Sequence, residues 1–249
     1  QIYNVFNMPD DHVTLIINES ILKEAYRTYN NSLVRNKVRK VHLINDGGWE
    51  EIFDYNKKGL ITKWEIISSD GSSSYYNLLY NEDGNLFAAI YPWQSLTNPD
   101  TICTYSIYDK GSTIYRHTHS RHGINFYKFT YDSLLTYKLT DVLNFSSDML
   151  KFEESFKMEY DSAGSLSGFL FPNGKEYISI VRDSNSAAVL RSDKFYYKYT
   201  FSDNKIREFI TERSAFNYFY NKDGLIDYTI EYYTDARSRK TIYKYEYYG

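Results

Sequence analysis

The chain has 249 residues, enough for one large β domain or two small ones. Its net charge of −3 gives no electrostatic sign of nucleic-acid binding, and no apolar run is long enough to be a transmembrane helix. The 28 tyrosines and 15 phenylalanines, beside only 4 prolines, favour β-sheets over helix bundles. The single cysteine, Cys103, excludes an internal disulfide.

Residues 1–36 differ in pattern from everything that follows. The β-branched run 13–17 predicts a strand, and the apolar spacing across 20–29 predicts a short helix. We expect this segment to cap the first open edge of the sheet that follows it.

From residue 38 onward, apolar and aromatic residues alternate with polar ones over short runs separated by turn residues. This period of two is typical of half-buried antiparallel strands. The predicted strands include 38–44, 49–55, 61–67, 75–80, 86–91, 127–131, 156–160, 197–201, 216–220 and 243–248.

A short phrase recurs where the strands turn: an aromatic residue, Asn or Asp, two polar residues and Gly. The clearest copy starts at Tyr220, and earlier copies start at Tyr55, Tyr80 and Tyr160. Asn or Asp can accept hydrogen bonds from the turn backbone, and Gly supplies the positive φ of a bulged hairpin. An apolar residue stands six positions after each Tyr, where we expect it to face that Tyr across the hairpin.

These patterns predict an all-β, single-domain protein. An N-terminal capping segment, 1–36, precedes a repeat sheet, 37–249, built as one long antiparallel meander of hairpins. A meander of this many strands twists and curls. Curling into a wide barrel-like shape is an alternative left open at this point.

The recurrent phrase resembles the tyrosine–aspartate (YD) repeats of rearrangement-hotspot proteins and teneurins, over most of the chain from about Val38 to Gly249. The chain is far shorter than the large members and lacks the sequence that ends their shells. It is more similar to small exported repeat proteins of Bacteroidetes-type bacteria. The resemblance implies a spiralling β-sheet, export to the surface or periplasm, and carbohydrate binding as a proposed activity, but no enzyme. The absence of Met at Gln1 also fits a mature protein whose leader was removed.

Two groups of residues are candidate sites. Trp49, Trp64 and Trp93 could stack on sugar rings, although aromatic residues in strands more often pack in the core. His117, His119 and His122 could hold a metal, since the first two share a strand face. A polar hairpin end explains the histidines better, so we predict no metal and no cofactor.

The leading functional prediction is a non-catalytic binding or structural scaffold, secreted, periplasmic or on the cell surface. The partner would be a glycan or an envelope protein, with no nucleic acid and no integral membrane span. The first alternative is a carbohydrate-binding protein with an exposed Tyr/Trp face. A less favoured one is a glycan-active hydrolase with carboxylates inside the curl. The oligomeric state is left open.

Overall fold

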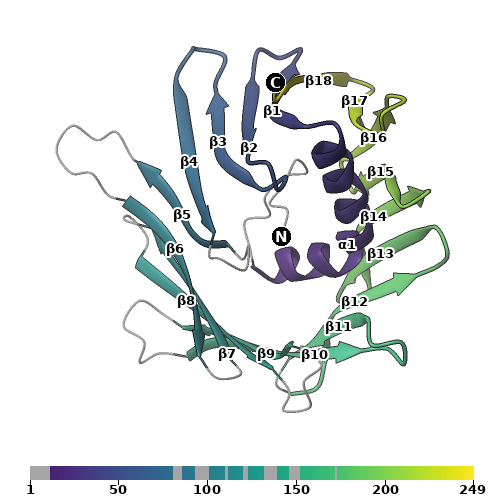
Figure 1. Ribbon diagram of the computed structural model, residues 1–249. Coiled ribbons are helices and arrows are strands. Elements are labelled where there is room, and N and C mark those ends of the chain that lie inside the picture. The colour runs from purple at the N-terminus through teal and green to yellow at the C-terminus, as the bar shows by residue number, and fades with distance from the viewer. Residues whose placement is uncertain are drawn as a thin grey trace. The chain divides into compact units, whose positions relative to one another are not determined.

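The computed structural model describes residues 12–80, 86–92, 101–109, 112–119, 123–131, 139–145, 152–171 and 173–249. Their side chains are described for residues 17, 18, 20–80, 157–171 and 173–249. The described chain is one helix followed by antiparallel strands that pair with their neighbours in sequence (Figure 1). The predicted all-β meander is therefore confirmed.

The elements in chain order have the following bounds. They are α1 (His12–Arg35), β1 (Val38–Asn45), β2 (Glu50–Tyr55), β3 (Ile61–Ile67), β4 (Ser73–Tyr80), β5 (Leu86–Pro92), β6 (Thr101–Asp109), β7 (Ser112–His119), β8 (Gly123–Tyr131), β9 (Leu139–Phe145), β10 (Phe152–Tyr160), β11 (Leu166–Leu170), β12 (Glu176–Arg182), β13 (Ser186–Arg191), β14 (Lys194–Ser202), β15 (Lys205–Thr211), β16 (Ser214–Tyr220), β17 (Ile226–Tyr233) and β18 (Ser238–Tyr247).

The chain divides into two compact units. Unit 1 comprises Gln1–Tyr75 and Ile180–Gly249, and unit 2 comprises Tyr76–Ser179. The predicted division at residue 36 falls inside unit 1 and stays a prediction.

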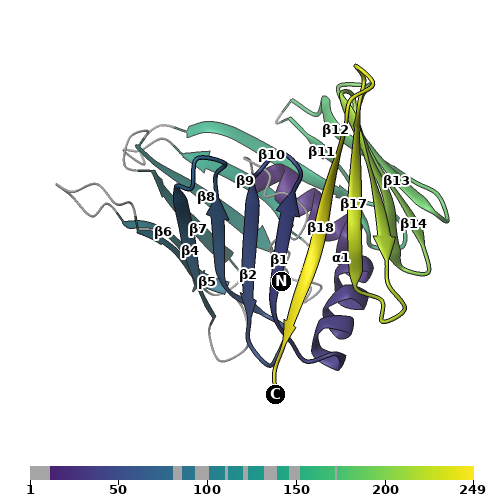
Figure 2. The ribbon, with the colours of Figure 1, turned by 90° about the horizontal axis from the view of Figure 1, so that it is seen from above.

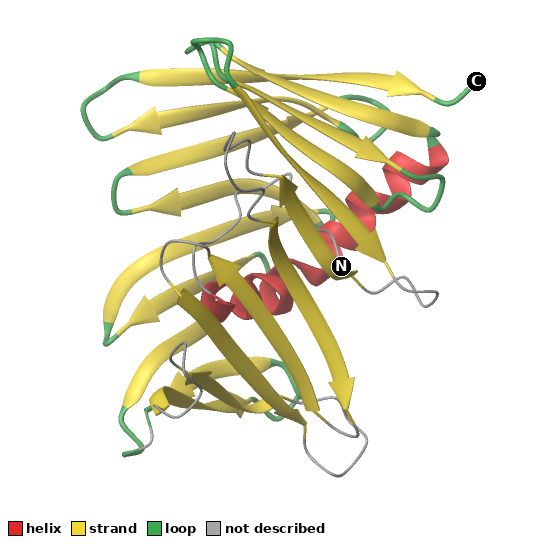
Figure 3. Cartoon of the chain, turned by 90° about the vertical axis from the view of Figure 1, so that its left-hand side faces the viewer, coloured by secondary structure: helices red, strands yellow, loops and turns green. Residues whose placement is uncertain are grey.

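The recurrent phrase forms the predicted hairpin turns in the copies at Tyr55, Tyr160 and Tyr220, and in the copy at Tyr80 the structure describes the two flanking strands. In four copies, the pairing register shifts between the Tyr and the residue that precedes it. The Tyr then pairs with the residue six positions later. The pairs are Tyr55 with Ile61, Tyr80 with Leu86, Tyr160 with Leu166, and Tyr220 with Ile226. Such a bulge takes up the extra residue that a type I turn with a left-handed Gly introduces. Green turns joining neighbouring yellow strands are visible in Figure 3.

The Asn and Asp side chains of the phrase stabilise the turns themselves. Asn56 Oδ1 accepts hydrogen bonds from the backbone N–H groups of Lys58 at 2.9 Å and Leu60 at 3.1 Å. Asn221 Oδ1 likewise accepts from two backbone N–H groups of its turn, each at 3.0 Å. These residues are turn formers, as the sequence indicates, because their oxygens are occupied by backbone donors.

In unit 1, β1 lies between β2 and β18, so the first and last strands are neighbours. Leu43 of β1 faces Tyr243 on one side and Glu51 on the other. Because β1 has a partner along each edge, α1 lies on a face of this sheet and not along its edge (Figures 1 and 2). We call the face that α1 covers the helix face and the opposite one the outer face.

The prediction of a strand at 13–17 is wrong, because α1 begins at His12 and continues without a break to Arg35. Ile17, Leu22, Ala25 and Tyr29 are buried at helical spacing. The β-branched run favours a strand locally, but burial of this stripe against the sheet outweighs that weak preference. At the helix end, Lys37 takes a left-handed conformation, with φ of 53°, and its N–H donates to the carbonyl of Val34.

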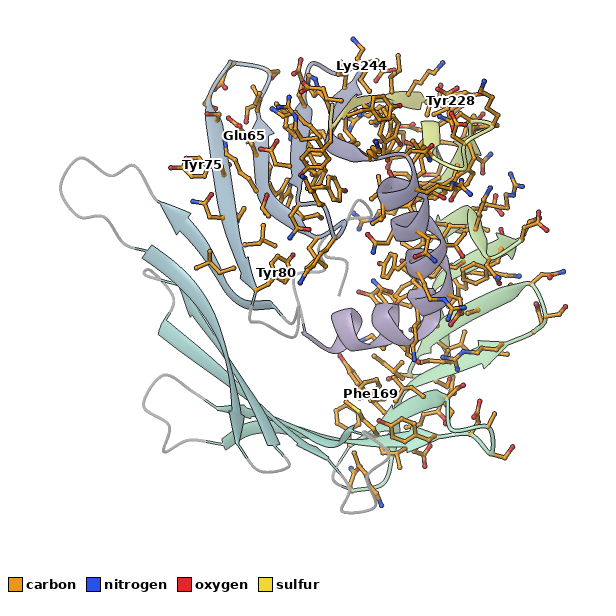
Figure 4. All side chains as sticks on the ribbon, viewed as in Figure 1. Glu65, Tyr75, Tyr80, Phe169, Tyr228 and Lys244 are labelled. Carbon is orange, nitrogen blue, oxygen red and sulfur yellow. The ribbon has the colours of Figure 1, made fainter. Side chains whose placement is uncertain are left out.

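In unit 2, the core that the described side chains form lies between β10, β11 and β12. Met158 of β10 faces Phe169 of β11, which in turn faces Ile178 of β12, and all three are buried. Figure 4 labels Phe169 on its strand. This row of apolar side chains follows from the alternation in each strand.

Candidate functional site

The most chemically distinctive group of unit 1 is a buried carboxyl on the helix face. Glu51 on β2 is only 8% exposed, and its Oε2 accepts a hydrogen bond from Trp64 Nε1 at 2.6 Å. Trp64 stacks on Phe53, with ring centroids 5.9 Å apart and planes 8° from parallel. Because residues 51, 53 and 55 point to the same face of β2, Glu51 is carried into the core with Phe53 and Tyr55.

Burial raises the pKa of Glu51 to about 7, from an ordinary value of 4.5, and the Trp64 hydrogen bond partly opposes this shift. The folded chain therefore binds this proton more tightly than the unfolded chain does. The stability that the proton contributes is fully present below about pH 4.5 and is lost as the pH rises through about 7.

Tyrosines line the rest of the helix face and connect it to α1. The hydroxyls of Tyr197 and Tyr199 donate to Asn18 Oδ1 at 3.1 and 3.5 Å. Tyr29 of α1 and Tyr245 of β18 share a hydroxyl–hydroxyl hydrogen bond of 3.2 Å. Buried hydroxyls need such partners, so this pattern fixes where α1 lies on the sheet.

Burial raises the pKa of Tyr29, Tyr218 and Tyr243 above the ordinary value of a tyrosine. All three are neutral hydrogen-bonding groups at physiological pH. They join helix and sheet without introducing charge into the interior.

The end of α1 contacts two turns of the recurrent phrase. Arg35 Nη2 and Asn36 Nδ2 donate to the carbonyl of Asp223 at 2.6 and 3.3 Å. A Cβ added at Gly59 would lie 2.4 Å from Asn30 Oδ1 and 2.7 Å from Val34 Cγ2. Two turns that are distant in sequence therefore pack against the same end of α1.

The three predicted tryptophans have different outcomes. Trp64 is half-buried on the helix face, with one ring face on Phe53 and its N–H on Glu51. Trp49 is half-buried beside the first turn, where its carbonyl accepts from the N–H of Asn45 at 2.9 Å. Trp93 lies outside the described residues. The part of the chain that the structure describes does not join the three into one aromatic face, and their role in binding stays a prediction.

The structure does not describe the side chains of the three predicted histidines. His122 lies outside the described residues, and His117 and His119 lie in β7, whose side chains are not described. Within the described side chains, no group of three or more His, Cys, Asp or Glu could hold a metal ion.

A small pocket of about 220 Å³ opens in unit 1 near the end of α1. It is lined by Val34, Lys37, Val38, Asn56, Lys57, Tyr248 and Gly249. Lys57 Nζ stands 6.0 Å from the centre of the Tyr248 ring, at the margin of a cation–π contact.

Sequence reasoning missed Glu51. The available signal was an acidic residue at the buried phase of an alternating strand, where Glu51, Phe53 and Tyr55 recur every second residue. It also missed a row of apolar side chains on the outer face, because only pairing across strands brings them together. The row consists of Phe219, Tyr228, Ile242 and Ile44.

The comparisons with known proteins found solved structures that are similar at low sequence identity. No family model matches the chain, and no curated protein matches it. A porin-like protein from Bacteroides uniformis is 12% identical, with 85% of this chain and 97% of that chain covered, and a TM-score of 0.44.

Two Tc toxin structures also show similarity. TcdB2-TccC3 is 8% identical, with 77% of this chain and 13% of that chain covered, and a TM-score of 0.34. The Photorhabdus luminescens Tc holotoxin pore is 11% identical, with 76% of this chain and 14% of that chain covered, and a TM-score of 0.33. Membership of the YD-repeat family stays a prediction. In the described part of the chain, no helix has both the length and the apolar character needed to cross a bilayer.

Proposed function

We propose that this protein is a non-catalytic binding or structural scaffold that is exported, to the periplasm, the cell surface or the medium. One observation carries the proposal: three hydrogen bonds on the helix face join its polar side chains to each other or to α1. Glu51 holds Trp64, Asn18 accepts from Tyr197, and Tyr29 bonds Tyr245. Groups engaged in this way position a helix on a sheet, and that arrangement suits a rigid support.

Export is supported by the resemblance of the turn phrase to YD repeats, whose members are exported. Fractionation of the cells that make the protein, with protease treatment of intact cells, tests this directly. We expect the chain in the envelope or medium fraction. Recovery in the cytoplasmic fraction would contradict the location.

The absence of catalysis is tested at Glu51, the carboxyl with the strongest chemical signature. A buried carboxyl with a pKa near 7 is what a general acid would need. We expect the purified protein and Glu51→Gln to give the same background rate on a panel of polysaccharides. Turnover by the wild type that Glu51→Gln abolishes would replace the scaffold with the hydrolase alternative.

The carbohydrate-binding alternative is favoured by exposed tyrosines on unit 1. Tyr232 and Tyr247 are 44% and 52% exposed, so their rings are accessible to a ligand. A glycan array probed with the wild type and with Tyr232→Ala and Tyr247→Ala separates the two functions. We expect no glycan whose binding depends on either tyrosine. A glycan signal lost in one variant would establish sugar binding.

A further inference from the structure

The pocket of about 220 Å³ in unit 1 lies where three segments that are distant in sequence meet. Val34 at the end of α1 and Lys37 just after it form one wall. The turn between β2 and β3 contributes Asn56 and Lys57, and Tyr248 follows β18. Figures 1 and 2 show the end of α1 near the C-terminal end of β18.

Hydrogen bonds among these segments fix the walls of the pocket. The N–H of Tyr248 donates to the carbonyl of Lys37 at 2.8 Å, and the Tyr248 hydroxyl donates to the carbonyl of Tyr55. Asn56 Oδ1 accepts from two backbone N–H groups of its own turn, at 2.9 and 3.1 Å. The pocket is therefore formed before a ligand arrives, which lowers the entropy cost of binding.

The side-chain groups that the pocket leaves to a ligand are mainly donors. Because the oxygen of the Asn56 amide is occupied, its Nδ2 is the group that remains. Lys37 and Lys57 are exposed, and among the ion pairs of the described residues neither has a carboxylate partner. The described residues that line the pocket include no Asp or Glu. Cationic donors in an acid-free lining favour an anionic ligand.

The carboxylates closest in sequence to the lining residues are held by other cations. Asp54, near the end of β2, pairs with Lys40 at 3.5 Å. Glu246, near the end of β18, pairs with Arg39 at 2.5 Å. Each pair is neutral as a whole, so neither cancels the charge of the pocket lysines.

The end of a helix carries a partial negative charge, which by itself disfavours an anion. In α1 this charge is opposed, because the carbonyl of Val34 accepts from the N–H of Lys37 at 3.0 Å. Arg35 adds a guanidinium at the same end, and it meets Asp223 through the backbone carbonyl, at 2.6 Å. With Arg35, Lys37 and Lys57 against Asp223, the end of α1 keeps a positive charge.

We propose that this pocket binds a small phosphate monoester with an apolar or aromatic body. A phosphate monoester carries about two negative charges at neutral pH, which match the two lysines, whereas a carboxylate carries one. Lysine binds phosphate as a point charge. This inference goes beyond the proposed scaffold function and does not depend on it.

The other lining residues fit the body of such a ligand. Val34, Val38 and the Tyr248 ring supply apolar walls. Lys57 Nζ stands 6.0 Å from the centre of the Tyr248 ring, so a phosphate held by Lys57 places its body beside that ring. A cavity of about 150 Å³ admits benzene. A pocket of about 220 Å³ therefore has room for one ring and a phosphate group.

The probe is phenyl phosphate, titrated into the full chain by isothermal titration calorimetry at low and high salt. Inorganic phosphate, which lacks the ring, and benzyl alcohol, which lacks the charge, are the matched ligands. We expect phenyl phosphate to bind once per chain and more weakly at high salt. Inorganic phosphate should bind at least about tenfold more weakly, and benzyl alcohol should give no signal.

Two substitutions test the lysines. The double variant Lys37→Asn, Lys57→Gln should lose at least about tenfold affinity for phenyl phosphate. Asn suits position 37 because φ there is 53°, a conformation that Asn tolerates. Lys58→Gln is the matched control, since Lys58 is an exposed lysine of the same turn that does not line the pocket, and its affinity should stay within about twofold of the wild type. Circular dichroism of each variant separates lost binding from lost folding.

Vesicles distinguish a soluble ligand from a lipid headgroup. Phosphatidic acid is also a phosphate monoester, so phosphatidylcholine vesicles with and without it are sedimented with the chain. Cosedimentation that the double variant loses assigns the lipid source, and phenyl phosphate binding without cosedimentation assigns a soluble ligand. Failure of phenyl phosphate to bind, or an equal loss of affinity in the double variant and in Lys58→Gln, would overturn the inference and leave the scaffold function as it stands.

Discussion

Replacing Gly59 by alanine tests whether the turn phrase seats α1. Gly59 has φ of 75°, and an added Cβ would lie 2.4 Å from Asn30 Oδ1 and 2.7 Å from Val34 Cγ2. Both atoms belong to the last turns of the helix. The matched control is Gly71→Ala, because Gly71 has φ of 81° and nothing within 4 Å of its added Cβ.

The two turns share the same backbone pattern, so subtraction isolates the helix contact. Gly59 N–H donates to the carbonyl of Asn56 at 2.9 Å, and Gly71 N–H donates to the carbonyl of Ser68 at 2.9 Å. Alanine in the left-handed region costs about 1–2 kcal/mol at either position. Crowding against α1 adds about 1–3 kcal/mol at Gly59 alone. We therefore expect Gly59→Ala to lower the free energy of unfolding by about 2–5 kcal/mol, and Gly71→Ala by about 1–2 kcal/mol.

Equilibrium unfolding in urea, followed by far-UV circular dichroism, measures both values. The double variant Gly59→Ala, Val34→Ala should recover part of the loss, because it removes the contact at Val34 Cγ2, and Val34→Ala alone costs little at a residue that is 42% exposed. Gly59→Ala and Gly71→Ala variants that agree within about 0.5 kcal/mol would refute the seating of α1 on this turn.

Three further changes test the helix face and the turns. Glu51→Gln should remove the fall in the free energy of unfolding between about pH 4.5 and 7. Above pH 7 the variant should be more stable than the wild type by up to about 3 kcal/mol, as measured by urea titrations at several pH values. An unchanged pH profile would count against a buried, protonated Glu51. Asn18→Ala should lower the free energy of unfolding by about 1–3 kcal/mol, measured by thermal unfolding, because two tyrosine hydroxyls lose their acceptor. A decrease below about 0.5 kcal/mol would show that Asn18 does not hold α1. Asn221→Ala should cost about 1 kcal/mol by urea unfolding and Asn221→Asp much less, since Asp keeps the oxygen that accepts the two turn N–H groups; equal losses would contradict that role.

The sequence by itself determined the strands and the turns that join them. The strand 61–67 has the predicted bounds, and the pairing of Tyr220 with Ile226 follows the six-residue spacing. Both features are local: alternation sets which face a side chain occupies, and the Asn and Gly of a turn act within five residues. Local interactions involve residues that are close in the chain, so a sequence pattern can predict them.

Only the tertiary structure decided the placement of α1, the burial of Glu51 and the row from Phe219 to Ile44. The run 13–17 is helical because its continuation packs on a sheet whose strands come from both ends of the chain. Glu51 is buried because β2 points residues 51, 53 and 55 to one face, and the helix covers that face. The row on the outer face exists because β18 pairs with β1 in a register that sets Ile242 beside Ile44. Each of these features depends on contacts between residues that are distant in the chain. The energies of these contacts outweigh local conformational preference, and no pattern of neighbouring residues predicts them.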